Sequence, residues 1–113
     1  MSFYTVIKTE LKDRKYIILA LEEMKRRGEI TSFKHLMKKD IIQVDRAGDT
    51  ITIKQDSRTG NFQLEGDSRI LEAFTKRFKQ FYAYQTIKEN LPLDFEIDVE
   101  REVAGNITLL LKG

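Results

Sequence analysis

The sequence predicts an α+β fold in which two β-α-β-β units form one mainly antiparallel sheet, with two helices packed on one face. Three observations predict it. Alternating polar and apolar residues, typical of half-buried strands, occur near the start, in the middle and at the end of the chain. Two longer stretches carry apolar residues at helical spacing. The 113 residues fit one domain, residues 1–113, with one hydrophobic core.

The first unit begins with a strand over residues 3–11, in which alternate side chains fall on opposite faces. A helix is expected to follow, because the Asp13 side chain can cap its amino end and Gly28 can end it. The apolar stripe of this helix consists of Ile17, Ala20, Leu21 and Met24.

Three short strands are expected next, over residues 41–45, 50–54 and 61–65. They are separated by RAGD and QDSRTG, which are rich in turn-forming residues, so the segment reads as a meander. Residues 29–40 give no clear pattern.

The second unit contains a helix that Asp67 or Ser68 can cap and that runs to about Leu91, before Pro92. The stretches DFEIDVERE and ITLLLK then predict two strands joined by the turn AGN. Each unit thus has the same order of elements, although the two halves show no obvious sequence identity, so the possible duplication is one of architecture.

The stretch RFKQFYAYQTIKEN, residues 77–90, mixes aromatic rings with cations and raises the question of nucleic-acid binding. On a helix, most of the rings lie within about 60° of one line. That line consists of Ile70, Leu71, Phe74, Phe78 and Phe81, whereas Lys76 and Lys79 fall near the opposite side. The rings are therefore expected to pack in the core.

Polar groups beside this stripe predict a binding site between the second helix and the sheet. Tyr82 and Tyr84 flank the stripe, and Gln85 lies within it, where a buried amide needs a partner. A structural glutamine is the simpler reading; the alternative is a polar group at the base of a pocket. Lys8 and Thr9 of the first strand are the candidate residues on the sheet side.

Three segments resemble a family of cyanobacterial, plastid and other prokaryotic proteins catalogued as domain of unknown function twelve fifty-seven, the Ycf-thirty-five-like proteins. These segments are SFYTVIKT at residues 2–9, TGNFQLEGD at 59–67 and YAYQT at 82–86. Family members usually carry histidine at the position of Phe3, so any role of that ring is not carried over. The resemblance implies a fold and a set of positions but no established activity. The genomic association of such proteins with AAA-type ATPases implies an adaptor or accessory role.

Basic residues near the end of the first helix predict an alternative function, binding to nucleic acid or to an acidic protein. The candidates are Lys25, Arg26, Arg27, Lys34, Lys38 and Lys39. A solvated helix end would also explain them, and the net charge of +2 is far from that of a dedicated nucleic-acid binder. Ile18 and Leu19 extend the apolar surface of the first helix and predict self-association or a protein partner.

No catalytic motif is present, and the expected function is a non-enzymatic binding or adaptor module without cofactor. The chain has no cysteine and a single histidine, His35, so neither a catalytic residue nor a metal site is expected. The lack of a signal-peptide pattern and of a long apolar run favours a cytoplasmic protein without membrane contact.

Overall fold

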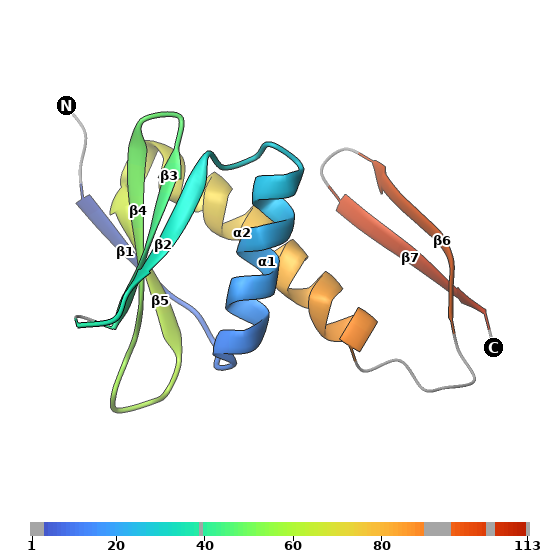
Figure 1. The fold of residues 1–113 in the computed structure, drawn as a ribbon, viewed down its shortest axis with the longest axis horizontal. Coiled ribbons are helices and arrows are strands. Elements are labelled where there is room, and N and C mark those ends of the chain that lie inside the picture. The colour runs from blue at the N-terminus through green and yellow to red at the C-terminus, as the bar shows by residue number, and fades with distance from the viewer. Residues whose placement is uncertain (1–3, 39, 90–95, 104–105, 113) are drawn as a thin grey trace.

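The computed structural model describes residues 4–38, 40–89, 96–103 and 106–112, and in the last two ranges it describes the backbone alone. Along the chain, nine elements follow one another (Figure 1). They are β1 (Tyr4–Lys8), α1 (Arg14–Arg26), β2 (Ser32–Leu36), β3 (Ile41–Arg46), β4 (Asp49–Gln55), β5 (Phe62–Asp67), α2 (Ser68–Glu89), β6 (Glu96–Val103) and β7 (Asn106–Lys112).

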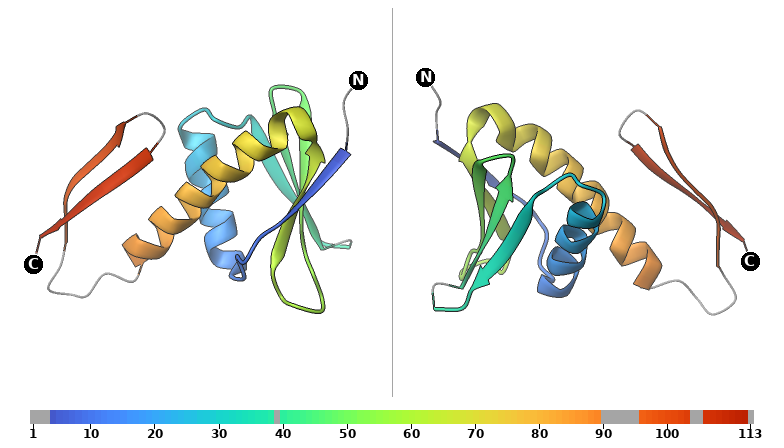
Figure 2. Two further views of the ribbon diagram at one scale, coloured as in Figure 1. Left: turned by 180° about the vertical axis from the view of Figure 1, so that it is seen from behind. Right: turned by 45° about the horizontal axis from the view of Figure 1, so that its top comes forward.

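Strands β1 to β5 form one antiparallel sheet in the order β1-β5-β4-β3-β2. Both helices lie on the same side of this sheet, and α2 crosses α1 (Figures 1 and 2). The register places apolar residues opposite one another, as with Ile7 and Ile53, which both pair with Leu64. The predicted α+β class with an antiparallel sheet is confirmed.

The distribution of the strands differs from the prediction in two respects. First, β2 lies in the segment without a clear pattern; Phe33 packs against the core from β2, but the polar His35 holds the next inward position and interrupts the apolar alternation. Second, β6 and β7 pair with each other in a separate two-stranded sheet instead of joining the main sheet. Alternation predicts that a segment is a strand, but not which strand it pairs with.

The two predicted ends of α1 are confirmed. The Asp13 carboxylate accepts a hydrogen bond of 3.0 Å from the Lys15 backbone N–H. Gly28 adopts a φ of 78°, which permits the Glu29 N–H to donate to the Met24 carbonyl at 2.8 Å and so closes the last turn. At the start of α2, the Asp67 carboxylate accepts from the Arg69 N–H at 2.8 Å.

The core lies between the two helices and the inner face of the sheet. The predicted stripe of α2 is buried except for Ile70, which is half-buried and packs against the core, and the planes of Phe74 and Phe78 stack with ring centroids 5.9 Å apart. Lys76 and Lys79 are exposed on the other side of α2. Burial of each ring stabilises the fold by about 1.5–3 kcal/mol, so these aromatic residues are structural. Among the residues whose side chains the structure describes, the core consists of Ile17, Ala20, Leu21, Met24, Ile30, Ile42, Val44, Ile51, Ile53, Phe62, Leu64, Leu71, Phe74, Phe78 and Phe81.

Neither helix has a stretch that is both long and apolar enough to cross a membrane, within the part of the chain that the structure describes.

Candidate functional site

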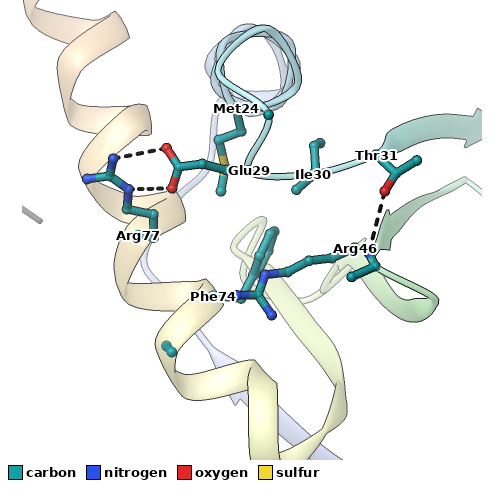
Figure 3. Close-up of a pocket in the computed structure, with 10 residues that line it drawn as sticks. Met24, Glu29, Ile30, Thr31, Arg46, Phe74 and Arg77 are labelled. Atoms are coloured by element: carbon teal, nitrogen blue, oxygen red, sulfur yellow. Dashed lines mark hydrogen bonds and ion pairs between the residues drawn. The ribbon is translucent and has the colours of Figure 1, made fainter.

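A cavity of about 400 Å³ lies between the α1–β2 connection, the β3–β4 turn and α2 (Figure 3). Its apolar wall includes Met24, Ile30 and Phe74, which belong to the core. Its polar lining consists of four residues from three segments, namely Glu29, Thr31, Arg46 and Arg77. Apolar walls with a few convergent polar groups are typical of ligand sites in proteins, and the volume falls in the usual range of about 300–1,000 Å³.

Two turns shape this cavity. Gly28 ends α1, and the chain then turns toward the sheet. There the Thr31 N–H donates to the Asp45 carbonyl of β3 at 2.8 Å. The β3–β4 hairpin turns at Ala47 and Gly48, whose φ angles of 51° and 90° match a two-residue turn. The Thr31 hydroxyl accepts a weak hydrogen bond of 3.4 Å from the Ala47 N–H, which holds the two turns together.

All three nitrogens of the Arg77 guanidinium form hydrogen bonds with neighbouring side chains. Its Nε and Nη2 lie 2.6 Å and 2.9 Å from the two carboxylate oxygens of Glu29, and Nη1 donates to the Gln80 amide oxygen at 3.0 Å. The same group lies 4.7 Å from the centre of the Phe81 ring. The Arg77 side chain is 18% exposed and that of Glu29 is 27% exposed, so the pair is partly shielded from water. This bidentate pair ties α2 to the end of α1.

Arg46 differs from Arg77, because its side chain has no hydrogen bond or ion pair with any other residue that the structure describes. It is the last residue of β3 and is partly buried. Its side chain extends across the cavity toward Phe74 (Figure 3). Since the Glu29 carboxylate is bound by Arg77, the cavity keeps one positive charge without a counter-ion, which suits an anionic group.

The structure does not bring the predicted site residues of α2 together with those of the first strand. Lys8 and Thr9 line a separate pocket beside Phe62, and no predicted residue of α2 lines it. The Tyr82 hydroxyl accepts a hydrogen bond of 3.2 Å from the Asp13 N–H at the start of α1. Lys8 lies on the face that points away from the helices, as the alternating burial of β1 indicates. Thr9 is buried and its hydroxyl donates to the Phe62 carbonyl at 2.6 Å, which is a structural role.

Tyr84 and Gln85 are buried, as expected for groups beside the core stripe. The Tyr84 ring is contacted by cations, with Lys88 Nζ at 4.9 Å and the Arg27 guanidinium at 5.8 Å from its centre. Neither Tyr84 nor Gln85 lines the cavity at Arg46.

The predicted basic cluster does not form one patch. Arg26 and Arg27 both pair with the Glu23 carboxylate, Arg27 at 2.8 Å, at the end of α1. Lys34 lies in β2 next to the inward-facing Phe33, so its side chain faces the open side of the sheet. The others separate as well: Lys25 is exposed on α1, Lys38 is exposed after β2, and Lys39 lies outside the described residues.

The predicted interface on α1 is only partly accessible. Ile18 packs against the core and Leu19 is half-buried. Two residues of β1 are more open among the described part of the chain, Tyr4 with 68% and Val6 with 44% of its surface exposed. This exposure could not be predicted from the sequence, because the alternation of a strand does not show whether it lies at the edge of a sheet.

His35 takes part in a polar cluster that connects α1 to the β2–β3 turn. Its Nε2 lies 3.2 Å from an Asp40 oxygen, and Arg14 Nη1 lies 2.5 Å from the same oxygen. Arg14, and secondly His35, lower the pKa of Asp40 from 3.8 to about 2. Within the described ranges, no group of three or more histidine or acidic side chains is placed to bind a metal ion.

Sequence reasoning missed Glu29 and Arg46 as site residues. Glu29 lies in the segment that gave no pattern, and Arg46 is the first residue of the predicted turn RAGD, where a cation is unremarkable. The signal that joins them to Arg77 is spatial, since 48 residues separate Glu29 from Arg77.

Comparisons with known proteins give no match: no family model fits the sequence, and neither the curated proteins nor the solved structures contain a similar chain.

Proposed function

We propose that this protein is a non-enzymatic binding module, and that the cavity at Arg46 takes an acidic side chain of a partner protein. The observation that supports this function is the partly buried Arg46, whose guanidinium has no partner among the described residues, in a cavity with apolar walls. A planar guanidinium binds a carboxylate through two parallel hydrogen bonds, and a shielded site strengthens them. The Thr31 hydroxyl, which keeps its own proton, is a second donor.

The arrangement favours a carboxylate over nucleic acid. A nucleic-acid surface needs several cations along one face to follow successive phosphates. Here, Arg26 and Arg27 share one carboxylate, and Lys34 lies on the opposite face of the sheet. The family resemblance adds an AAA-type ATPase as a candidate partner, in which case the acidic side chain would belong to that protein.

A calorimetric titration with a triglutamate peptide tests the proposal. We expect wild-type protein to bind and Arg46→Met to bind at least about tenfold more weakly, because a hydrogen bond to a charged group contributes about 1.5–3 kcal/mol. Arg58→Met is the matched control, since Arg58 is an exposed arginine in the β4–β5 connection, which does not line this cavity. Equal affinities of wild type and Arg46→Met would refute the proposed site.

The nucleic-acid alternative has its own test. We expect no complex with mixed-sequence DNA or RNA in a salt titration that starts at low salt. A complex that weakens steeply as salt rises, and that Arg46→Met leaves unchanged, would favour the alternative function.

A further inference from the structure

The second half of the chain repeats the first half at a nearly constant offset. β4 spans residues 49–55 and β7 spans 106–112, an offset of 57 at both ends. The strands before them, β3 and β6, end at residues 46 and 103, again 57 apart, and the dipeptide Ala-Gly follows each of them in the sequence. β1 and β5 begin 58 residues apart, and a helix follows each of these two strands. Apart from β2, which has no counterpart after α2 among the described elements, the order strand-helix-hairpin therefore occurs twice, with β1 equivalent to β5 and β4 equivalent to β7.

The equivalent strands β1 and β5 pair with each other but have unequal neighbours. β5 has β1 on one side and β4 on the other. β1 has β5 on one side and no neighbour on the other among the described strands. The strand equivalent to β4 is β7, which pairs with β6 alone, and the β6–β7 hairpin lies on the far side of the helices from β1 (Figures 1 and 2).

The free edge of β1 has the properties of a strand-binding site. The Thr9 N–H donates to the Phe62 carbonyl, and backbone groups alternate along a strand, so the N–H groups of Tyr4, Val6 and Lys8 point away from β5. Two large apolar side chains of β1 are also exposed to solvent, Tyr4 by 68% and Val6 by 44%. An exposed edge with apolar side chains is a template for an added strand.

The β6–β7 hairpin has the properties of the strand pair that would bind to this edge. Two strands without a further partner are marginally stable, and the sequence of β7 contains Ile107 and three successive leucines. A strand with this composition is expected to lie inside a larger sheet.

We propose that β7 of a second copy of this chain pairs antiparallel with β1, as β4 pairs with β5. The second copy is the occupant because, within one chain, the β6–β7 hairpin lies on the far side of the helices from its own β1. Exchange around a two-fold axis gives both copies a seven-stranded sheet and leaves neither β1 edge open.

The register follows from the repeat. β4 pairs Ile53 with Leu64 and Lys54 with Gln63 on β5. β1 and β5 begin 58 residues apart, but Ile7 and Leu64, which both face the core, are 57 apart. An offset of 57 on both strands therefore keeps the inward faces equivalent and turns these pairs into Leu110 with Ile7 and Leu111 with Val6.

Cysteine cross-linking tests the pairing and identifies the chain that supplies β7. The sequence has no cysteine, so Val6→Cys combined with Leu111→Cys can form only the intended disulfide or a bond between identical sites. Directly opposed residues of antiparallel strands are close enough for a disulfide. We expect a covalent dimer on a non-reducing gel after mild oxidation, and little dimer from either single-cysteine control.

A disulfide within one chain would overturn the second copy as occupant, and the absence of a disulfide would overturn the register. Hydrogen exchange then tests the pairing without depending on register. We expect the amides of Val6 and Lys8 to exchange slowly in the dimer and to lose that protection on dilution to monomer, whereas the Ile7 amide, which faces β5, stays protected. Fast exchange at Val6 and Lys8 at every concentration would overturn the proposal.

Discussion

Arg46 and Arg77 line the same cavity, but only the charge of Arg77 is paired with a carboxylate among the described residues. The Arg77 guanidinium binds both oxygens of Glu29, the Gln80 amide and the face of Phe81. Arg46 approaches the same space from the end of β3 and has no polar partner among the described residues. Arg77 therefore stabilises the fold, whereas the charge of Arg46 is available to a ligand.

This difference shows how burial and pairing separate structural from functional cations. A partly buried guanidinium with a carboxylate partner holds two elements together, and its removal leaves an unpaired carboxylate. A partly buried guanidinium without such a partner contributes little to folding, so its position is better explained by something that binds to it. Four predictions test this distinction, in order of decreasing expected effect on stability.

Replacement of Arg77 is expected to have the largest effect. Arg77→Met should lower the free energy of unfolding by about 2 kcal/mol, less than for a fully buried pair because both side chains keep some exposure. Urea denaturation followed by circular dichroism measures this change. The double variant Arg77→Met/Glu29→Gln should regain part of the loss, since the unpaired carboxylate is then gone. If the double variant is no more stable than Arg77→Met, Glu29 is not the group that Arg77 neutralises.

Acid should weaken the Arg14–Asp40 pair in a narrow pH range. The folded-state pKa of Asp40 is lowered to about 2 from 3.8, so its stabilising effect is fully present above pH 4 and is lost as the pH falls toward 2. Thermal unfolding between pH 5 and pH 2 measures it. The variant Asp40→Asn should show a smaller loss of stability over this range than the wild type, and an identical loss would argue against the pair.

A surface arginine with a carboxylate partner should have a smaller effect. Arg69 pairs with Asp67 at 2.7 Å, but its side chain is 69% exposed, so water screens the interaction. Arg69→Met should lower the free energy of unfolding by less than about 1 kcal/mol in the same urea experiment. A loss of stability equal to that of Arg77→Met would show that the contribution of these arginines to the free energy of unfolding depends on ion pairing and not on burial.

Replacement of Arg46 should have the smallest effect on stability. Arg46→Met retains most of the aliphatic length of the side chain and breaks no observed ion pair. The free energy of unfolding should therefore change by no more than about 0.5 kcal/mol. The loss of triglutamate binding should nevertheless be the largest among these variants. A loss of stability similar to that of Arg77→Met would mean that Arg46 has a structural role.

The elements with a strong local pattern were predictable from the sequence. Capping by Asp13, the end of α1 at Gly28 and the buried stripe around Phe78 depend on residues close in the chain, and all three are confirmed. β2 was not predictable, because His35 occupies an inward position and interrupts its pattern. The separate pairing of β6 with β7 could not be predicted either, since strand alternation carries no information on partners.

The candidate site was predicted less well than the fold. Tyr82 and Thr9 are polar groups that satisfy backbone partners, and Lys8 shares a pocket with Thr9 but not with Tyr82. The cavity at Arg46 depends on contacts between segments that are distant in sequence, such as Glu29 with Arg77. A single sequence reveals which residues can carry charge, but the fold decides which of those charges remain without a partner.

The most direct measurement is a side-chain ¹⁵N NMR titration that follows the Nε–Hε signals of Arg46 and Arg77 while triglutamate is added. If Arg46 is the available charge, its signal should shift progressively to saturation while that of Arg77 stays in place. A shift of the Arg77 signal with an unchanged Arg46 signal, or no shift of either, would contradict the proposed division between the two arginines.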